Sequence, residues 1–94
     1  MNLYTFILDY LGGTYISQIE SENKEQAMMR WIENLEIDQV DGFSHEDQTL
    51  IIEKGFDVED PSLLDGLSNV WHFLVDTNRG TGYVNFVNTV KMLK

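Results

Sequence analysis

The feature that most constrains the fold is an alternation of large apolar side chains near the start of the chain. They occupy every second position over residues 4–10, which is the period of a β-strand with one buried face. Gly12 and Gly13 follow, and glycine adopts the positive φ angles that a tight hairpin turn requires. A two-residue turn at these glycines pairs Leu8 with Ser17. The residues predicted to share the buried face of this first hairpin are Tyr4, Phe6, Leu8, Tyr10, Tyr15 and Ile19.

A second hairpin is predicted at the other end of the chain. Val70–Thr77 and Tyr83–Val90 are rich in β-branched and aromatic residues, and the glycine-containing segment 78–82 separates them. An even loop around Arg79 and Gly80 separates apolar from polar side chains better than an odd loop does, so we prefer it. The predicted pairs are Val75 with Val84, Phe73 with Phe86 and Trp71 with Asn88. The predicted buried face holds Trp71, Phe73, Val75, Val84, Phe86 and Val90.

Between the hairpins the pattern changes to that of an amphipathic helix. Asn23 is a favourable N-cap, and Gln26 follows it at the spacing of a capping box. The spacing predicts a helix from about Lys24 to Glu36 that packs its apolar stripe on the first hairpin. The stripe consists of Ala27, Met28, Trp31, Ile32 and Leu35.

The segment after this helix is predicted to hold a loop and a second, shorter helix. Ile37–Phe43 is the expected loop, Ser44 the expected N-cap, and Gly55 the expected C-terminal stop. A short strand over Thr49–Glu53 is the alternative, because β-branched residues lower helix propensity there. Pro61–Asp65 is expected to form one helical turn.

These elements predict an α+β fold with the order ββααββ. We expect a two-layer sandwich in which an antiparallel four-stranded sheet carries both helices on one face. With 94 residues, 43% of them hydrophobic, the chain is expected to form a single domain over residues 1–94. The strand order is left open.

Charge and composition exclude several classes of function. The net charge is −10, and a chain this acidic is a poor candidate for binding nucleic acid. The absence of cysteine excludes disulfides and thiolate metal sites. The chain has no apolar run long enough for a membrane span and no basic segment of the signal-peptide type at its start. We therefore expect a cytoplasmic protein that associates with no membrane.

No arrangement typical of catalysis is apparent. His45 and His72 are not joined to other ligands at metal-binding spacing, and no serine stands in a nucleophile elbow. The chain is therefore predicted to be neither an enzyme nor a carrier of a metal or cofactor.

The acidic middle is the most informative surface. Fourteen acidic and three basic residues lie between residues 20 and 65. Such a field steers and selects a basic protein partner, although it also serves solubility alone. The predicted partner-binding residues are Glu33, Glu36, Asp38 and Asp41 in one group and Asp57, Glu59, Asp60 and Asp65 in another.

Two short segments carry a resemblance to known proteins. The hairpin sequence 12–18 and the strand sequence Asn69–Trp71 resemble a family of short uncharacterised bacterial proteins. The hairpin followed by a helix with Gln26-Ala27 resembles the start of HicB-type antitoxins. The first resemblance implies no particular activity. The second implies an interaction protein of the antitoxin kind, with no residues carried over.

Two other functions are kept as alternatives. A homodimer would form through sheet surface at Leu74, Tyr83 and Val87, or through an edge strand. A small-ligand site would use His72, Asp76 and Tyr83, which share one face in the preferred register.

Overall fold

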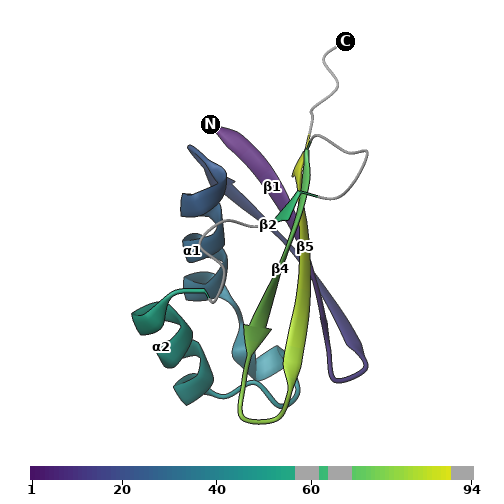
Figure 1. The fold of residues 1–94 in the computed structure, drawn as a ribbon, viewed down its shortest axis with the longest axis vertical. Helices are drawn as coiled ribbons and strands as arrows, with labels where there is room; N and C mark the ends of the chain where they lie inside the picture. The colour runs from purple at the N-terminus through teal and green to yellow at the C-terminus, as the bar shows by residue number, and fades with distance from the viewer. Residues whose placement is uncertain (57–61, 64–68, 90–94) are drawn as a thin grey trace.

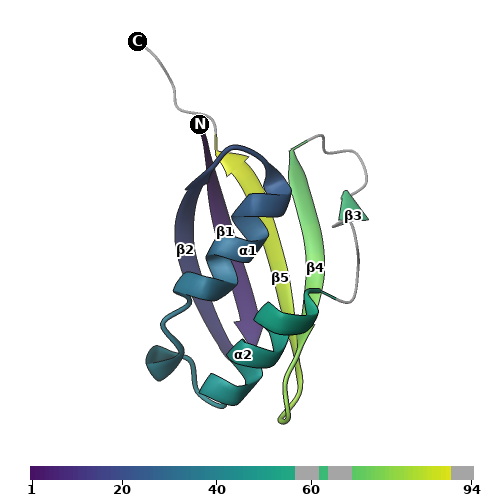
Figure 2. The same cartoon turned by 90° about the vertical axis from the view of Figure 1, so that its left-hand side faces the viewer.

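A computed structural model describes residues 1–56, 62–63 and 69–89 of the chain. It shows one antiparallel sheet with both helices on one face (Figures 1 and 2). The elements in chain order are β1 (Asn2–Tyr10), β2 (Gly13–Ser21), α1 (Lys24–Asn34), the 3₁₀ turn η1 (Ile37–Gln39), α2 (His45–Lys54), β3 (Ser62–Leu63), β4 (Val70–Asp76) and β5 (Thr81–Thr89). The predicted α+β fold is confirmed, with the four predicted strands in one antiparallel sheet and the helices on one face; the two-residue strand β3 is a fifth strand that was not predicted.

The strand order is β2-β1-β5-β4-β3, so the two long hairpins meet through β1 and β5. The short strand β3 pairs with β4 at the far edge. Ser62 and Leu63 are thus extended, which contradicts the helical turn predicted there; the rest of Pro61–Asp65 lies outside the described residues. Val90 also lies outside them.

The core forms where the two hairpins meet. Phe6 of β1 lies directly opposite Phe86 of β5, and their rings stack with centroids 4.6 Å apart. Trp31 of α1 stacks on Phe6 with centroids 5.6 Å apart, as the predicted packing of the helix stripe requires. Phe73 of β4 meets the Trp31 ring edge-on. Aromatic side chains from three strands and one helix therefore form the centre of the core.

The first hairpin has the predicted faces but a register shifted by two residues. Leu8 pairs with Tyr15 rather than with Ser17, and the turn is Leu11–Gly12 with positive φ angles of 47° and 84°. Gly13 lies in the strand, and a Cβ atom there would lie 2.6 Å from the Tyr15 hydroxyl oxygen. The second glycine therefore makes room for the Tyr15 ring instead of forming the turn.

The second hairpin shows the same shift. Val75 pairs with Gly82 rather than with Val84, and the loop closes one residue earlier than predicted, at Asn78 and Arg79. A Cβ atom on Gly82 would lie 2.8 Å from Val75 Cγ2 and 2.9 Å from Leu8 Cδ1. Gly82 therefore lets the side chains of Val75 and Leu8 pack closely against the backbone of β5. A shift of two residues leaves every side chain on its predicted face, so the predicted buried faces are correct for the described residues.

Helix α1 ends two residues before the predicted end at Glu36. Its terminal carbonyls are bound by a side chain from α2: Gln48 Nε2 donates to the Ile32 oxygen at 2.8 Å and to the Leu35 oxygen at 3.2 Å. The expected loop then contains the η1 turn. Because a 3₁₀ helix has three residues per turn, the side chains of Ile37 and Val40 both point into the core.

Helix α2 confirms Ser44 as N-cap and Gly55 as C-cap, and the alternative strand over Thr49–Glu53 is wrong. The cap is a reciprocal capping box: the Asp47 amide donates to Ser44 Oγ at 3.0 Å, and the Ser44 amide donates to Asp47 Oδ2 at 3.1 Å. These hydrogen bonds satisfy backbone amides that have no partner within the helix. They stabilise the helix against the low helix propensity of its β-branched residues.

Asp47 also ties α2 to the second hairpin. Its other oxygen, Oδ1, accepts a hydrogen bond of 3.1 Å from the backbone amide of Asn78 in the β4–β5 turn. Burial by itself raises the pKa of Asp47. The amides of Ser44 and Asn78, the Ser44 hydroxyl and the charge of Arg79 outweigh that effect, so the pKa lies below its ordinary value. The buried carboxylate is therefore held in its charged form.

Replacing Trp31 with alanine should lower the free energy of unfolding by about 3–5 kcal/mol, because it removes a buried ring from the centre of the core. Urea denaturation followed by circular dichroism measures the change. Glu33→Ala on the exposed side of the same helix should change it by less than about 0.5 kcal/mol. Equal losses in the two variants would contradict the packing described here.

Asp47→Ala should lower the free energy of unfolding at neutral pH by about 1–3 kcal/mol, because it removes a cap and leaves the Asn78 amide unpaired. Since folding lowers the carboxyl pKa, its stabilising contribution is complete above the ordinary value of about 3.9 and is lost as the pH falls below it. Denaturation at a series of pH values should show the gap between wild type and variant closing below about pH 4. The neighbouring Glu46→Ala is the control, and a gap independent of pH would contradict this role.

Candidate functional site

The four described partner-binding candidates come from one continuous stretch, which we call the acidic segment: Glu33, Glu36, Asp38 and Asp41. Glu33 lies in the last turn of α1, Asp38 lies in η1, and the other two lie just after these elements. All four side chains are exposed. The segment runs past the β2 side of the sheet (Figure 2). The second predicted group, Asp57, Glu59, Asp60 and Asp65, lies outside the described residues.

The acidic segment is not neutralised by the described part of the chain. Among residues 1–56, 62–63 and 69–89, the one ion pair joins Lys24 Nζ to Glu25 Oε1 at 3.2 Å, at the opposite end of α1. The segment itself contains no lysine or arginine. Its negative field is therefore available to a partner.

A groove of about 510 Å³ lies beside the acidic segment, between β2 and the chain from the end of α1 through η1. Glu36 is its one charged lining residue. The described residues that line it are Thr14, Tyr15, Ile16, Ser17, Gln18, Ile19, Trp31, Asn34, Leu35, Glu36, Gln39 and Val40. The groove thus combines an apolar wall, the outer side of a strand and a negative rim.

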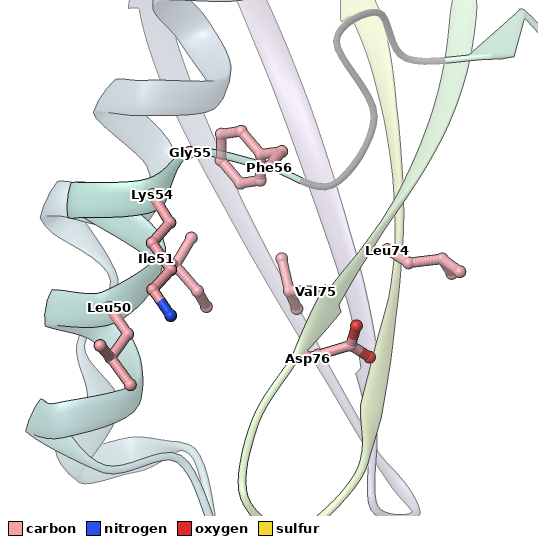
Figure 3. Close-up of a pocket in the computed structure, with 8 residues that line it drawn as sticks. All are labelled: Leu50, Ile51, Lys54, Gly55, Phe56, Leu74, Val75 and Asp76. Atoms are coloured by element: carbon pink, nitrogen blue, oxygen red, sulfur yellow. The ribbon is translucent and has the colours of Figure 1, made fainter.

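A smaller pocket of about 220 Å³ lies between α2 and β4 (Figure 3). Ile51, Phe56 and Val75 contribute apolar surface, and Lys54 is the one basic residue among the described residues that line it. Leu74 and Asp76 lie on the other side of β4 from Ile51, as the close-up shows. Ligand pockets usually measure about 300–1,000 Å³. This pocket is therefore small for a cofactor or a substrate of drug size.

His72, Asp76 and Tyr83 all lie on the sheet face that no described helix covers, which we call the open face. The rings of His72 and Tyr83 are 6.5 Å apart and nearly parallel, and His72 Nδ1 lies 3.2 Å from Asn85 Oδ1. Asp76 Oδ1 accepts a hydrogen bond from the Thr81 hydroxyl instead of contacting the imidazole. The carboxylate lies four residues from His72 on the same strand, about 13 Å along it. The structure therefore groups His72 with Tyr83 but sets Asp76 apart.

Sequence reasoning did not identify the outer side of β2 as part of a site. Sequence patterns identified β2 as a strand but left the strand order open, so its position at the sheet edge was not predicted. One signal was present: β2 contains neither lysine nor proline, the residues that commonly protect an exposed edge. The absence of these residues indicates an exposed edge only once the neighbouring strands are known.

Two further features of the described residues concern membranes and metals. No described helix is long and apolar enough to span a bilayer. No group of three or more histidine or carboxylate side chains in the described ranges is arranged to hold a metal ion.

Comparison with protein-family models, with curated proteins and with solved structures finds no match to this chain. The resemblances to short bacterial proteins and to HicB-type antitoxins therefore stay predictions from the sequence.

Proposed function

We propose that this chain is a non-catalytic docking module that recognises a basic protein through the acidic segment. The observation that carries the proposal is the set of four exposed carboxylates at residues 33–41, which the described chain leaves without a cationic partner. Opposite charge on a partner accelerates encounter and selects among competing proteins. A module that blocks a basic partner in this way would act as antitoxins and immunity proteins do.

The arrangement of the segment supports a role beyond solubility. Solubility requires only that charges of either sign be distributed over the surface. Here the carboxylates follow one another along the end of α1 and η1, beside a groove with an apolar wall. A partner bound there would gain both charge complementarity and burial of apolar surface.

A homodimer formed through the open face is the second candidate. Three large apolar side chains are exposed on that face: Ile16 is 67% exposed, Tyr83 53% and Leu74 38%. No described element covers them. Leu74 and Tyr83 are cross-strand neighbours, and an exposed apolar patch is typical of association sites. In a dimer with two-fold symmetry, each copy would cover the open face of the other.

The docking module is tested by neutralising its charge. The variant Glu33→Gln/Glu36→Gln/Asp38→Asn/Asp41→Asn should lose any partner that the wild type captures from a lysate of its own cells at low salt. A matched variant with the same change in net charge, Asp9→Asn/Glu46→Gln/Glu53→Gln/Asp76→Asn, should retain it. Binding should weaken strongly between about 50 and 500 mM salt, since the Debye length falls severalfold.

Three results would contradict the docking module. One is capture that is insensitive to salt, another is equal loss of the partner in both charge variants, and the third is the absence of any captured partner.

The open-face dimer is tested by mass in solution. Light scattering at high micromolar concentration should give twice the chain mass of 10.9 kDa. Leu74→Lys/Tyr83→Lys should restore the monomer, because it places charges on the covered face. Gln39→Lys/Thr49→Lys adds the same charge at exposed positions of η1 and α2, away from the open face, and should leave the dimer intact. A monomeric wild type removes this candidate.

A further inference from the structure

The edge strand β2 is long and regular. It pairs with β1 over nine consecutive positions, from Asn2 with Ser21 to Tyr10 with Gly13, without a bulge. The described sheet places no strand on its other side. The opposite edge is different, because β3 has only two residues. Edge strands are normally shortened, bulged or guarded by lysine or proline, and β2 has none of these features.

The hairpin geometry fixes which backbone groups of β2 face outward. A two-residue turn makes Tyr10 and Gly13 a hydrogen-bonded pair, and bonded pairs alternate along an antiparallel ladder. The even-numbered residues of β2 therefore turn their N–H and C=O groups away from β1. Arg30 supports this assignment, because its Nη1 atom donates to the Glu20 carbonyl oxygen at 3.2 Å.

Within the described part of the chain, three residues of β2 consequently present a backbone donor and acceptor without a partner along the groove: Thr14, Ile16 and Gln18. This is the arrangement that an added strand requires, since backbone hydrogen bonds supply affinity and alternate side-chain positions supply specificity.

The surroundings indicate which side chains such a strand would carry. Residues of an added strand alternate between the groove and the open face. On the groove side, the partly exposed Leu35 offers apolar surface and Glu36 a negative rim, which suits the aliphatic stem and charged head of lysine or arginine. On the open face, the exposed Ile16 suits a β-branched residue.

We propose that β2 accepts an extended segment of a partner protein as an additional strand, one that alternates basic with β-branched residues. The inference rests on the proposed docking function and specifies how the partner binds. A second copy of the chain is the less favourable occupant, because each copy has a net charge of −10 and brings its own acidic segment toward the shared edge.

The test uses a labelled eight-residue peptide that alternates lysine and valine, with fluorescence anisotropy as the readout. The wild-type chain should bind it. Ile16→Pro should weaken binding on the order of tenfold or more, because proline removes an outward N–H and blocks the approach of a strand. Ile16→Thr keeps the N–H and should bind within about twofold of wild type. A peptide with the same composition in two blocks should bind more weakly than the alternating one.

A structural readout covers the possibility that Ile16→Pro fails to fold. In the wild-type complex, nuclear Overhauser contacts should join the peptide backbone to the backbone of Ile16 and Gln18. Glu36→Lys, which leaves the edge intact, should weaken the alternating lysine peptide and should favour a peptide in which glutamate replaces lysine.

The outcomes separate this inference from the docking function. Salt-sensitive binding without backbone contacts to β2, or with no preference for the alternating peptide, overturns strand addition and leaves the acidic docking module standing. A complete absence of binding overturns strand addition by this kind of segment. A concentration-dependent dimer with contacts between two β2 strands shows that a second copy occupies the edge, and this also overturns the proposal.

Discussion

The pairing of β1 with β5 is the interaction on which the rest of the structure depends. Each hairpin alone would be only marginally stable in water, since two strands cannot bury their own apolar face. Their antiparallel pairing places Phe6 against Phe86 and supplies a surface broad enough for α1. The same pairing puts β2 at one edge of the sheet and β4 near the other. The free edge, the groove and the open face all follow from it.

The helical layer covers one face of the sheet and determines where charge collects. The apolar stripe of α1 turns toward the core, so Glu33 points to solvent. The side chains of Glu36, Asp38 and Asp41 are also exposed, on the β2 side. Gln48 ends α1 early by binding its terminal carbonyls, which lets η1 continue the chain along the groove. Packing and capping, rather than charge itself, thus bring the acidic segment beside the exposed strand.

Much of this fold could be predicted from the sequence because its signals are local. Alternation assigned the buried faces of both hairpins, and Asn23 and Ser44 marked the two helix starts. The register could not be obtained in the same way, because a shift of two residues leaves every side chain on the same face. Gly13 and Gly82 suggested turns, but each lies in a strand where a neighbouring side chain needs the space.

The candidate site likewise has one part that could be predicted from the sequence and one part that could not. The exposure of the acidic segment follows from composition and helix periodicity, and it was predicted. The groove depends on the strand order, and the strand order depends on a pairing between residues about 80 positions apart in the chain. The hydrogen bond from Asn78 to Asp47 spans 31 residues, and it was missed for the same reason.

Residue-resolved amide hydrogen exchange on the free protein at low concentration tests whether β2 is an edge strand with one side unpaired. Exchange should be slow at Tyr15, Ser17 and Ile19, whose amides face β1, and fast at Thr14, Ile16 and Gln18. Uniform protection along β2 would contradict this assignment, because some other part of the chain would then already cover the edge.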